Sequence, residues 1–256
     1  MISSSEIRNI AIESGNAILE IYNSDNFEVE IKSDHSPLTK ADKLSHQIIK
    51  DGLTKLFPQI PVLSEEGKEI PYEERKEWNK FWLVDPLDGT KEFIKRNGEF
   101  TVNIALIKKG KPVFGLIHVP VTGETYFGDV ENGSYKTENN QGAKRISVSK
   151  KKPGDRLTVV QSRSHSGEEE KEFYSNFDIN EKLSRGSSLK ICMVAEGKAE
   201  LYFRGGPTWE WDTAAGHAIL LGAGGYFVNK DKSPLLYNKE IIKNFGFIAS
   251  SFQIRN

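Results

Sequence analysis

Two short apolar segments of the 256-residue chain end in acidic residues that could do chemistry. Residues 61–63 run into Ser-Glu-Glu-Gly at 64–67, and residues 81–84 run into Asp-Pro-Leu-Asp-Gly-Thr at 85–90. Pro86 disfavours helix at the preceding residue, so a turn would hold Asp85 and Asp88 toward one space. Carboxylates at the end of a buried strand lose hydration, and a hard divalent cation would neutralise them. Because the sequence has no Cys/His cluster to bind zinc, the pattern predicts Mg²⁺.

A short helix is predicted at residues 90–95, directly after these acids, and Asn97-Gly98 would end it. Its first N–H groups would face the acids, which suits a phosphate ester as ligand. Other interpretations are open: residues 85–89 also have the composition of an ordinary turn, and Asp212 also fits a helix N-cap. Acids recur in this arrangement on separate elements, at Glu65 and at Asp212, and this favours a metal and phosphate site.

The elements that must position these acids follow from hydrophobic periodicity. Helices are expected at 3–22, 40–56, 167–177, 189–196 and 211–221, and strands at 27–32, 61–63, 81–84, 156–161, 199–203, 226–228 and 245–249. From residue 100 onward, strands are joined by turns at 109–112 and 122–123. Leu44, Ile48 and Leu56 are expected to form the buried stripe of the second helix, and the charged segment 69–80 is expected to be solvated. This order favours an α+β or layered α/β enzyme, with a boundary near residues 130–155.

Composition excludes several classes of protein. The chain has 35 Lys and Arg against 36 Asp and Glu, a net charge of −1, which provides no field to hold a nucleic acid polymer. Its single cysteine, Cys192, cannot form an internal disulfide, which suits the cytoplasm. No apolar run approaches the ~18 residues of a transmembrane segment, and the N-terminus lacks a signal-peptide core.

Three motifs, at residues 63–67, 82–90 and 211–216, resemble the signatures of the inositol monophosphatase superfamily of lithium-sensitive, Mg²⁺-dependent phosphatases. The stretch 88–96 is similar to that of the bacterial 3'(2'),5'-bisphosphate nucleotidases, and the similarity continues at 97–107, 162–165 and 186–190. The resemblance implies a layered α/β/α/β/α sandwich of the inositol monophosphatase and fructose-1,6-bisphosphatase type. One catalytic unit would comprise an α+β half, residues 1–140, with the metal site, and an α/β half, residues 141–256, with much of the nucleotide site.

The same resemblance implies a role for particular residues. Two Mg²⁺ ions, with a third weaker ion as an option, would be bound by Glu65, Asp85, the carbonyl of Leu87, Asp88 and Asp212. The catalytic residues would be Glu65, together with Asp42 and Thr90, which would orient and deprotonate the attacking water. The substrate contacts would be Glu65, Leu87, Asp88, Gly89, Thr90, His165, Ser187, Lys190, Arg204 and Asp212. From the residues alone, Asp42 is equally a first-turn helix acid, Lys190 a surface lysine and His165 a loop residue.

The implied activity is hydrolysis of the 3'-phosphate of adenosine 3',5'-bisphosphate (PAP) to AMP and phosphate, linked to sulfate assimilation in sulfur metabolism. Two alternatives are open: an inositol monophosphatase or other small phosphate monoesterase of the same superfamily, and a non-catalytic sensor of nucleotide or Mg²⁺. The implied location is the cytoplasm, with peripheral attachment to the inner face of the membrane as a second option. Glu210 departs from the apolar or amide residue expected before Trp211, which affects the nucleotide pocket, and the sequence does not determine the oligomeric state.

Overall fold

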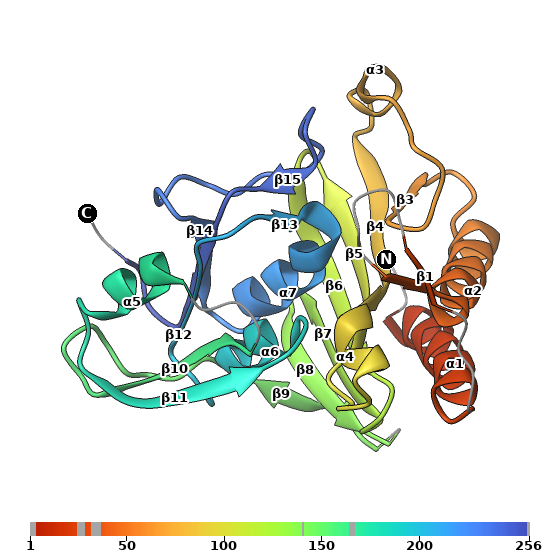
Figure 1. Cartoon of the computed structure of the whole chain (residues 1–256). Helices are drawn as coiled ribbons and strands as arrows, with labels where there is room; N and C mark the ends of the chain where they lie inside the picture. The colour runs from red at the N-terminus through yellow and green to blue at the C-terminus, as the bar shows by residue number, and fades with distance from the viewer. Residues whose placement is uncertain (1–3, 25–28, 32–36, 140, 164–166, 255–256) are drawn as a thin grey trace.

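The computed structural model describes residues 4–24, 29–31, 37–139, 141–163 and 167–254. Five layers follow one another across the molecule (Figure 1). Helices α1 (Ser4–Tyr22) and α2 (Lys40–Leu56) cover one face of a seven-stranded sheet. Helices α6 (Leu189–Ala195) and α7 (Glu210–Gly222) lie between its other face and a five-stranded sheet, and α5 (Glu168–Tyr174) covers the far side. The predicted α/β/α/β/α architecture is confirmed.

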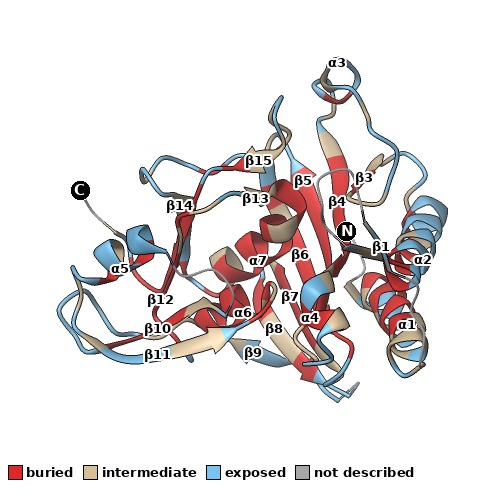
Figure 2. Cartoon of the chain, in the orientation of Figure 1, coloured by how far each residue is buried: buried red, intermediate tan, exposed pale blue. Residues whose placement is uncertain are grey.

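The seven-stranded sheet has its strands in chain order, β3 to β9, and only β3 and β4 are parallel. The strands are β3 (Val62–Ser64), β4 (Lys80–Asp88), β5 (Thr101–Lys108), β6 (Lys111–Val119), β7 (Glu124–Asp129), β8 (Gly133–Glu138) and β9 (Lys144–Ile146). Antiparallel neighbours need only short connections, and the predicted turns at 109–112 and 122–123 join β5 to β6 and β6 to β7. Figure 2 shows that burial is concentrated in this sheet and in α7.

The five-stranded sheet has the order β11-β10-β12-β16-β14 and is mixed. Its strands are β10 (Leu157–Ser162), β11 (Ile179–Arg185), β12 (Leu201–Arg204), β14 (Tyr226–Asn229) and β16 (Phe247–Ser250). The sequence did not predict the edge strand β11, because its residues are mostly polar and partly exposed. Two small antiparallel pairs complete the fold: β1 (Val29–Ile31) with β2 (Pro37–Thr39), and β13 (Thr208–Trp209) with β15 (Lys243–Asn244).

The prediction for the buried stripe of α2 was wrong. Leu44 and Leu56 are 39% and 37% exposed, and Ile48 is half-buried. The buried residues of α2 are Ala41, Asp42, Ser45, Ile49 and Leu53. The small residues face α1 because they allow the two helices to approach closely, and the hydroxyls of Ser14 and Ser45 lie 2.7 Å apart.

The charged segment 69–80 contains the short helix α3 (Tyr72–Arg75), which is largely exposed in Figure 2. Arg75 contradicts the solvated prediction, because it is only 4% exposed. Its guanidinium donates to the Asn238 side chain at 2.9 Å and to the carbonyls of Lys239 and Glu240 at 2.6 and 2.8 Å. Among the described residues, no helix is long and apolar enough to cross a membrane.

Candidate active site

A β-bulge in β4 positions the central pair of acids. Asp85 and Asp88 lie opposite Asn103 and Thr101 of β5, so two residues of β4 face one residue of its partner between them. One of these two β4 residues is Pro86, which has no N–H to donate to the ladder. The acids are therefore held by an interruption of a buried strand rather than by the isolated turn that the sequence suggested.

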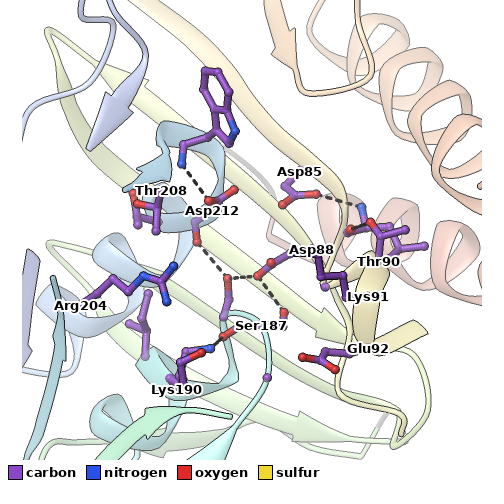
Figure 3. Close-up of a pocket in the computed structure, with 18 of the residues that line it drawn as sticks. Asp85, Asp88, Thr90, Lys91, Glu92, Ser187, Lys190, Arg204, Thr208 and Asp212 are labelled. Carbon is purple, nitrogen blue, oxygen red and sulfur yellow. Dashed lines mark hydrogen bonds between the residues drawn. The ribbon is translucent and has the colours of Figure 1, made fainter. Parts of the chain in front are cut away.

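The structure brings the predicted residues together in one cleft of about 310 Å³. Its walls come from the end of β4, the start of α4 (Thr90–Ile94), the turn before α6, and β12 to α7 (Figure 3). The predicted ligands and contacts that line it are Glu65, Asp85, Leu87, Asp88, Gly89, Thr90, Ser187, Lys190, Arg204 and Asp212. His165, the remaining predicted substrate contact, lies outside the described residues.

Gly89 allows the two halves of the chain to meet at this cleft. It has φ of 92° and precedes α4, a left-handed conformation that disfavours a side chain. A Cβ atom here would also lie 3.2 Å from the Glu99 carbonyl and 3.3 Å from Ser187 Cβ. Glycine therefore lets the turn at Ser187 pack directly against the start of α4.

Asp42 reaches the cleft through Thr90. The Thr90 hydroxyl donates to Asp42 Oδ1 at 3.1 Å, with the Leu87 carbonyl as an alternative acceptor at 3.3 Å. The other carboxylate oxygen, Oδ2, accepts from the Thr39 N–H at 2.8 Å and from its hydroxyl at 2.5 Å. Asp42 is thus both a capping residue of α2 and the hydrogen-bond partner of Thr90, so the two interpretations of this residue are compatible.

The acids repel one another strongly. Burial raises the pKa of Asp85 well above its usual range, and the charges of Glu65 and Asp88 add to the rise. Burial likewise raises the pKa of Asp212, followed by the charges of Asp88 and Glu65. Positive charge inside the cleft is therefore needed before all of these carboxylates can ionise together.

The hydrogen bonds to three of the acids leave room for a cation. Asp85 accepts from the Leu87 N–H through Oδ1 at 3.1 Å, and Asp212 accepts from the Trp209 N–H through Oδ2 at 2.8 Å. Asp88 accepts only through Oδ2. Within the described part of the chain, no protein donor reaches the second oxygen of any of the three.

These oxygens, with the carbonyl of Leu87, are the hard ligands that Mg²⁺ prefers, so the donor set fits a divalent cation. However, no three acidic, His or Cys side chains among the described residues already converge as a finished metal centre.

The opposite side of the cleft is basic (Figure 3). Burial lowers the pKa of Lys190 to about 8, and its ammonium donates to the carbonyls of Ser187 at 2.5 Å and Arg185 at 3.4 Å. The Arg204 side chain extends from β12 toward Asp212, and its Nε atom has no partner among the described residues. The cleft therefore has an acidic end and a basic end, which suits a ligand with two anionic groups.

Glu210 does not line this cleft, although the sequence placed it near the nucleotide pocket. Its fully buried carboxylate accepts from the N–H groups of Asn238 at 2.7 Å and Lys239 at 3.0 Å, and it pairs with the Lys239 ammonium at 2.7 Å. The same loop binds Arg75. Glu210 therefore anchors a loop behind the site.

Sequence reasoning missed several polar residues around the acids. Ser188, Asn103 and Thr101 are buried and hydrogen-bonded in a network that includes Asp88. A signal was present in the apolar strand β5, where Thr101 and Asn103 are polar residues two apart and thus share one face. Tyr202 and Phe247, which form part of the cleft floor, had no such signal.

The fold, together with a cleft lined by several carboxylates, is that of a phosphate-ester hydrolase. The chain belongs to the inositol monophosphatase family, whose model matches residues 4–252. It is 46% identical over 249 residues to the 3'(2'),5'-bisphosphate nucleotidase CysQ of Escherichia coli K12, which covers 96% of this chain and 99% of the relative.

Comparison with solved structures indicates the same family. The crystal structure of CysQ from Bacteroides thetaiotaomicron superposes with a TM-score of 0.85 at 42% identity, covering 97% of both chains. An inositol monophosphatase from Zymomonas mobilis superposes with a TM-score of 0.76 at 25% identity, covering 98% of this chain and 94% of that one. The predicted superfamily is confirmed.

Proposed function

We propose that this chain is a Mg²⁺-dependent 3'(2'),5'-bisphosphate nucleotidase that hydrolyses the 3'-phosphate of adenosine 3',5'-bisphosphate to AMP and phosphate. The observation behind this proposal is the polarity of the cleft, with acids at one end and Lys190 and Arg204 at the other. A bisphosphate needs both ends, whereas a monophosphate needs only one. Relatives named as nucleotidases are also far more similar to the chain than the inositol monophosphatase above.

The acidic end would hold the phosphate that is removed. Glu65, Asp85, Asp88, Asp212 and the carbonyl of Leu87 would bind two Mg²⁺ ions, and a third weaker ion is an option. When bound, the cations would supply the positive charge that activates a water molecule and neutralises the leaving oxygen. The main chain at Gly89 and Thr90 would orient the same phosphate.

Asp42 and Thr90 would take the proton of the attacking water. The Thr90 hydroxyl already donates its hydrogen to Asp42, so its oxygen can accept a hydrogen bond from water in the cleft. The proton can then move from water toward Thr90 as the Thr90 hydrogen moves toward the carboxylate. This relay needs Asp42 ionised at the start of the reaction.

The basic end would hold the second phosphate and the nucleoside. Lys190 uses two of its three N–H donors on main-chain carbonyls, and the third is left for the substrate. The Ser187 hydroxyl is already engaged by Asp88 and Thr101, so a contact from Ser187 would come from its main chain. His165 and the link to sulfate assimilation in the cytoplasm stay predictions.

A panel of phosphate esters, assayed with and without a chelator, tests this proposal. Adenosine 3',5'-bisphosphate is expected to be the preferred substrate over phosphoadenosine phosphosulfate, inositol monophosphate and fructose bisphosphate, and the chelator should abolish phosphate release. Dominant turnover of inositol phosphate would contradict the nucleotide assignment. Binding without phosphate release would indicate a sensor.

Substitution of the acids tests the metal site separately. Asp85→Asn and Asp88→Asn should each lower kcat by roughly 10³-fold, because metal activation contributes several kcal/mol to such reactions. Asp231→Asn, the same change at an exposed turn, should have no effect. A near-normal kcat for either cleft variant in Mg²⁺ would show that the ligand assignment is wrong.

A further inference from the structure

The carboxylate of Asp88 is oriented by two serine hydroxyls from the other half of the chain. Ser187 and Ser188 donate to its Oδ2 atom at 2.7 and 2.6 Å (Figure 3). Asn103 makes a longer contact with the same oxygen, at 3.4 Å. Because every donor that the structure gives to this carboxylate reaches Oδ2, its rotation is restricted and Oδ1 is left for another ligand.

The hydrogens of this network have a consistent direction. The Asn103 amide donates to Ser188 Oγ at 2.9 Å, so the single Ser188 hydrogen is available for Asp88. The Thr101 hydroxyl donates to Asn103 Oδ1 at 2.9 Å, and its oxygen also lies 2.6 Å from Ser187 Oγ. Thr101, Asn103 and Ser188 are 0%, 1% and 3% exposed, so water does not compete for these bonds.

Ser188 also contacts the second acidic element. Its hydroxyl lies 2.9 Å from the main-chain carbonyl of Asp212, in the first turn of α7. One buried side chain therefore touches both the β4 bulge and the helix that holds the third acid. No other side chain among the described residues lies within hydrogen-bond distance of both Asp88 and Asp212, and the single Ser188 hydrogen can be donated to either acceptor.

The turn that presents these serines is itself held in place. Glu99 accepts from the Gly186 N–H at 2.7 Å, and the Lys190 ammonium donates to the Ser187 carbonyl at 2.5 Å. Ser187 has φ of 52°, a left-handed conformation that a serine adopts only when its surroundings stabilise it. The surrounding bonds thus keep the turn in one arrangement.

We propose that Ser188 is a positioning residue that ties Asp88 to the start of α7 and so sets the spacing of two carboxylates for a divalent cation. This inference depends on the metal part of the proposed function. A cation held by two elements from different halves of a chain binds tightly only when those elements keep a fixed separation, since otherwise part of the binding free energy is used to assemble the ligands.

Binding of Mn²⁺ to the metal-free protein, followed by electron paramagnetic resonance without nucleotide, tests the inference. Ser188→Ala should weaken Mn²⁺ affinity by about 10- to 100-fold, the usual effect of losing a bond that orients a metal ligand. Ser188→Thr keeps the hydroxyl and should retain most of the affinity. Ser162→Ala removes a serine from the same cleft that has no bond to an acid, and should bind Mn²⁺ like the wild type.

Two results would overturn the inference. One is Mn²⁺ affinity for Ser188→Ala within about twofold of the wild type, which is far below the expected loss. The other is an equal loss for Ser188→Ala and Ser188→Thr, which would indicate packing rather than the hydroxyl. If Ser188→Ala does not fold, Asn103→Ala takes its place in the test, because it removes the donor that directs the Ser188 hydrogen. An unchanged Mn²⁺ affinity for Asn103→Ala would then overturn the inference.

Failure of the proposed function can be distinguished from failure of the role of Ser188. A wild-type protein that does not bind Mn²⁺ would contradict both the metal site and the role of Ser188. If the expected ranking of affinities is observed while the substrate panel favours another phosphate ester, only the nucleotide assignment fails, because Mn²⁺ binding is measured without substrate.

Discussion

Lys190 is a basic residue of the cleft whose charge changes close to neutral pH. Burial is the main reason that its pKa falls to about 8, and Arg204 lowers it further, while Asp88 and two glutamates oppose the shift. The charged form is therefore present at pH 7 and is lost as pH rises through 8. The lysine of the unfolded chain has its usual pKa of 10.5. Between about pH 8 and pH 10.5 the folded state therefore binds fewer protons than the unfolded state, and the free energy of unfolding rises with pH.

The proposed phosphate contact should lose strength in the same range. We expect kcat/KM for the nucleotide to fall about fivefold between pH 8 and pH 9, as the protonated fraction of Lys190 drops from about one half to about one tenth. Lys190→Arg keeps its charge, so its profile should be flat in this window. Parallel profiles for the two proteins would exclude Lys190 as the titrating group.

At the scale of elements, the position of α7 depends on its contact with β6. Gly115 of β6 lies directly under this helix, where a Cβ atom would be 2.1 Å from the Ala215 carbonyl oxygen. A helix backbone cannot move away from such a contact without shifting its first turn. The packing of α7 against the sheet therefore determines where Asp212 lies relative to Asp88.

Gly115→Ala should consequently destabilise the protein by about 1–3 kcal/mol, the range for overpacking a well-packed core, as measured by urea unfolding. Mn²⁺ affinity should fall in the same variant because α7 carries Asp212. Gly142→Ala is the control, since no atom of the described residues, its two chain neighbours aside, lies within 4 Å of its added Cβ, and it should change stability by less than about 0.5 kcal/mol. Equal stability for both variants would contradict this account of the helix contact.

At the scale of the whole molecule, the acidic cleft couples stability to pH and to metal. The raised pKa values of Asp85 and Asp212 mean that the metal-free folded state holds more protons than the unfolded state above the usual carboxylate range. Their contribution to stability is therefore present at low pH and is lost as pH rises through the folded-state values. A cation that binds the ionised carboxylates stabilises the folded state more as pH rises.

In a chelator, the free energy of unfolding should accordingly fall as pH rises above the usual carboxylate pKa, and Mg²⁺ should restore more of it at the higher pH. Asp85→Asn removes one of the repelling charges, so it should be more stable than the wild type in chelator at the higher pH and gain less from Mg²⁺. Asp231→Asn serves as the exposed control. A stabilisation by Mg²⁺ that does not change with pH would contradict the coupling.

Features that depend on neighbours in sequence were predictable. The bounds predicted for α2 agree with the structure, and the helix after Asp88 and the hairpin turns lie where expected, because caps, glycines and hydrophobic periods are local signals. The acids at strand ends could be recognised for the same reason. The buried face of α2 could not be predicted, because α1 approaches so closely that small residues of α2, and not Leu44, pack against it.

The sequence by itself determined which residue types are available to bind a cation and a phosphate, and the family to which the chain belongs. Only the tertiary structure decided what holds them in place. Ser188 contacts Asp88, which is 100 positions away in the sequence, and Glu210 binds a loop that also binds Arg75 instead of lining the cleft. These partners are set by packing between the two sheets, and such long-range contacts leave no periodic or local pattern in the sequence from which they could be read.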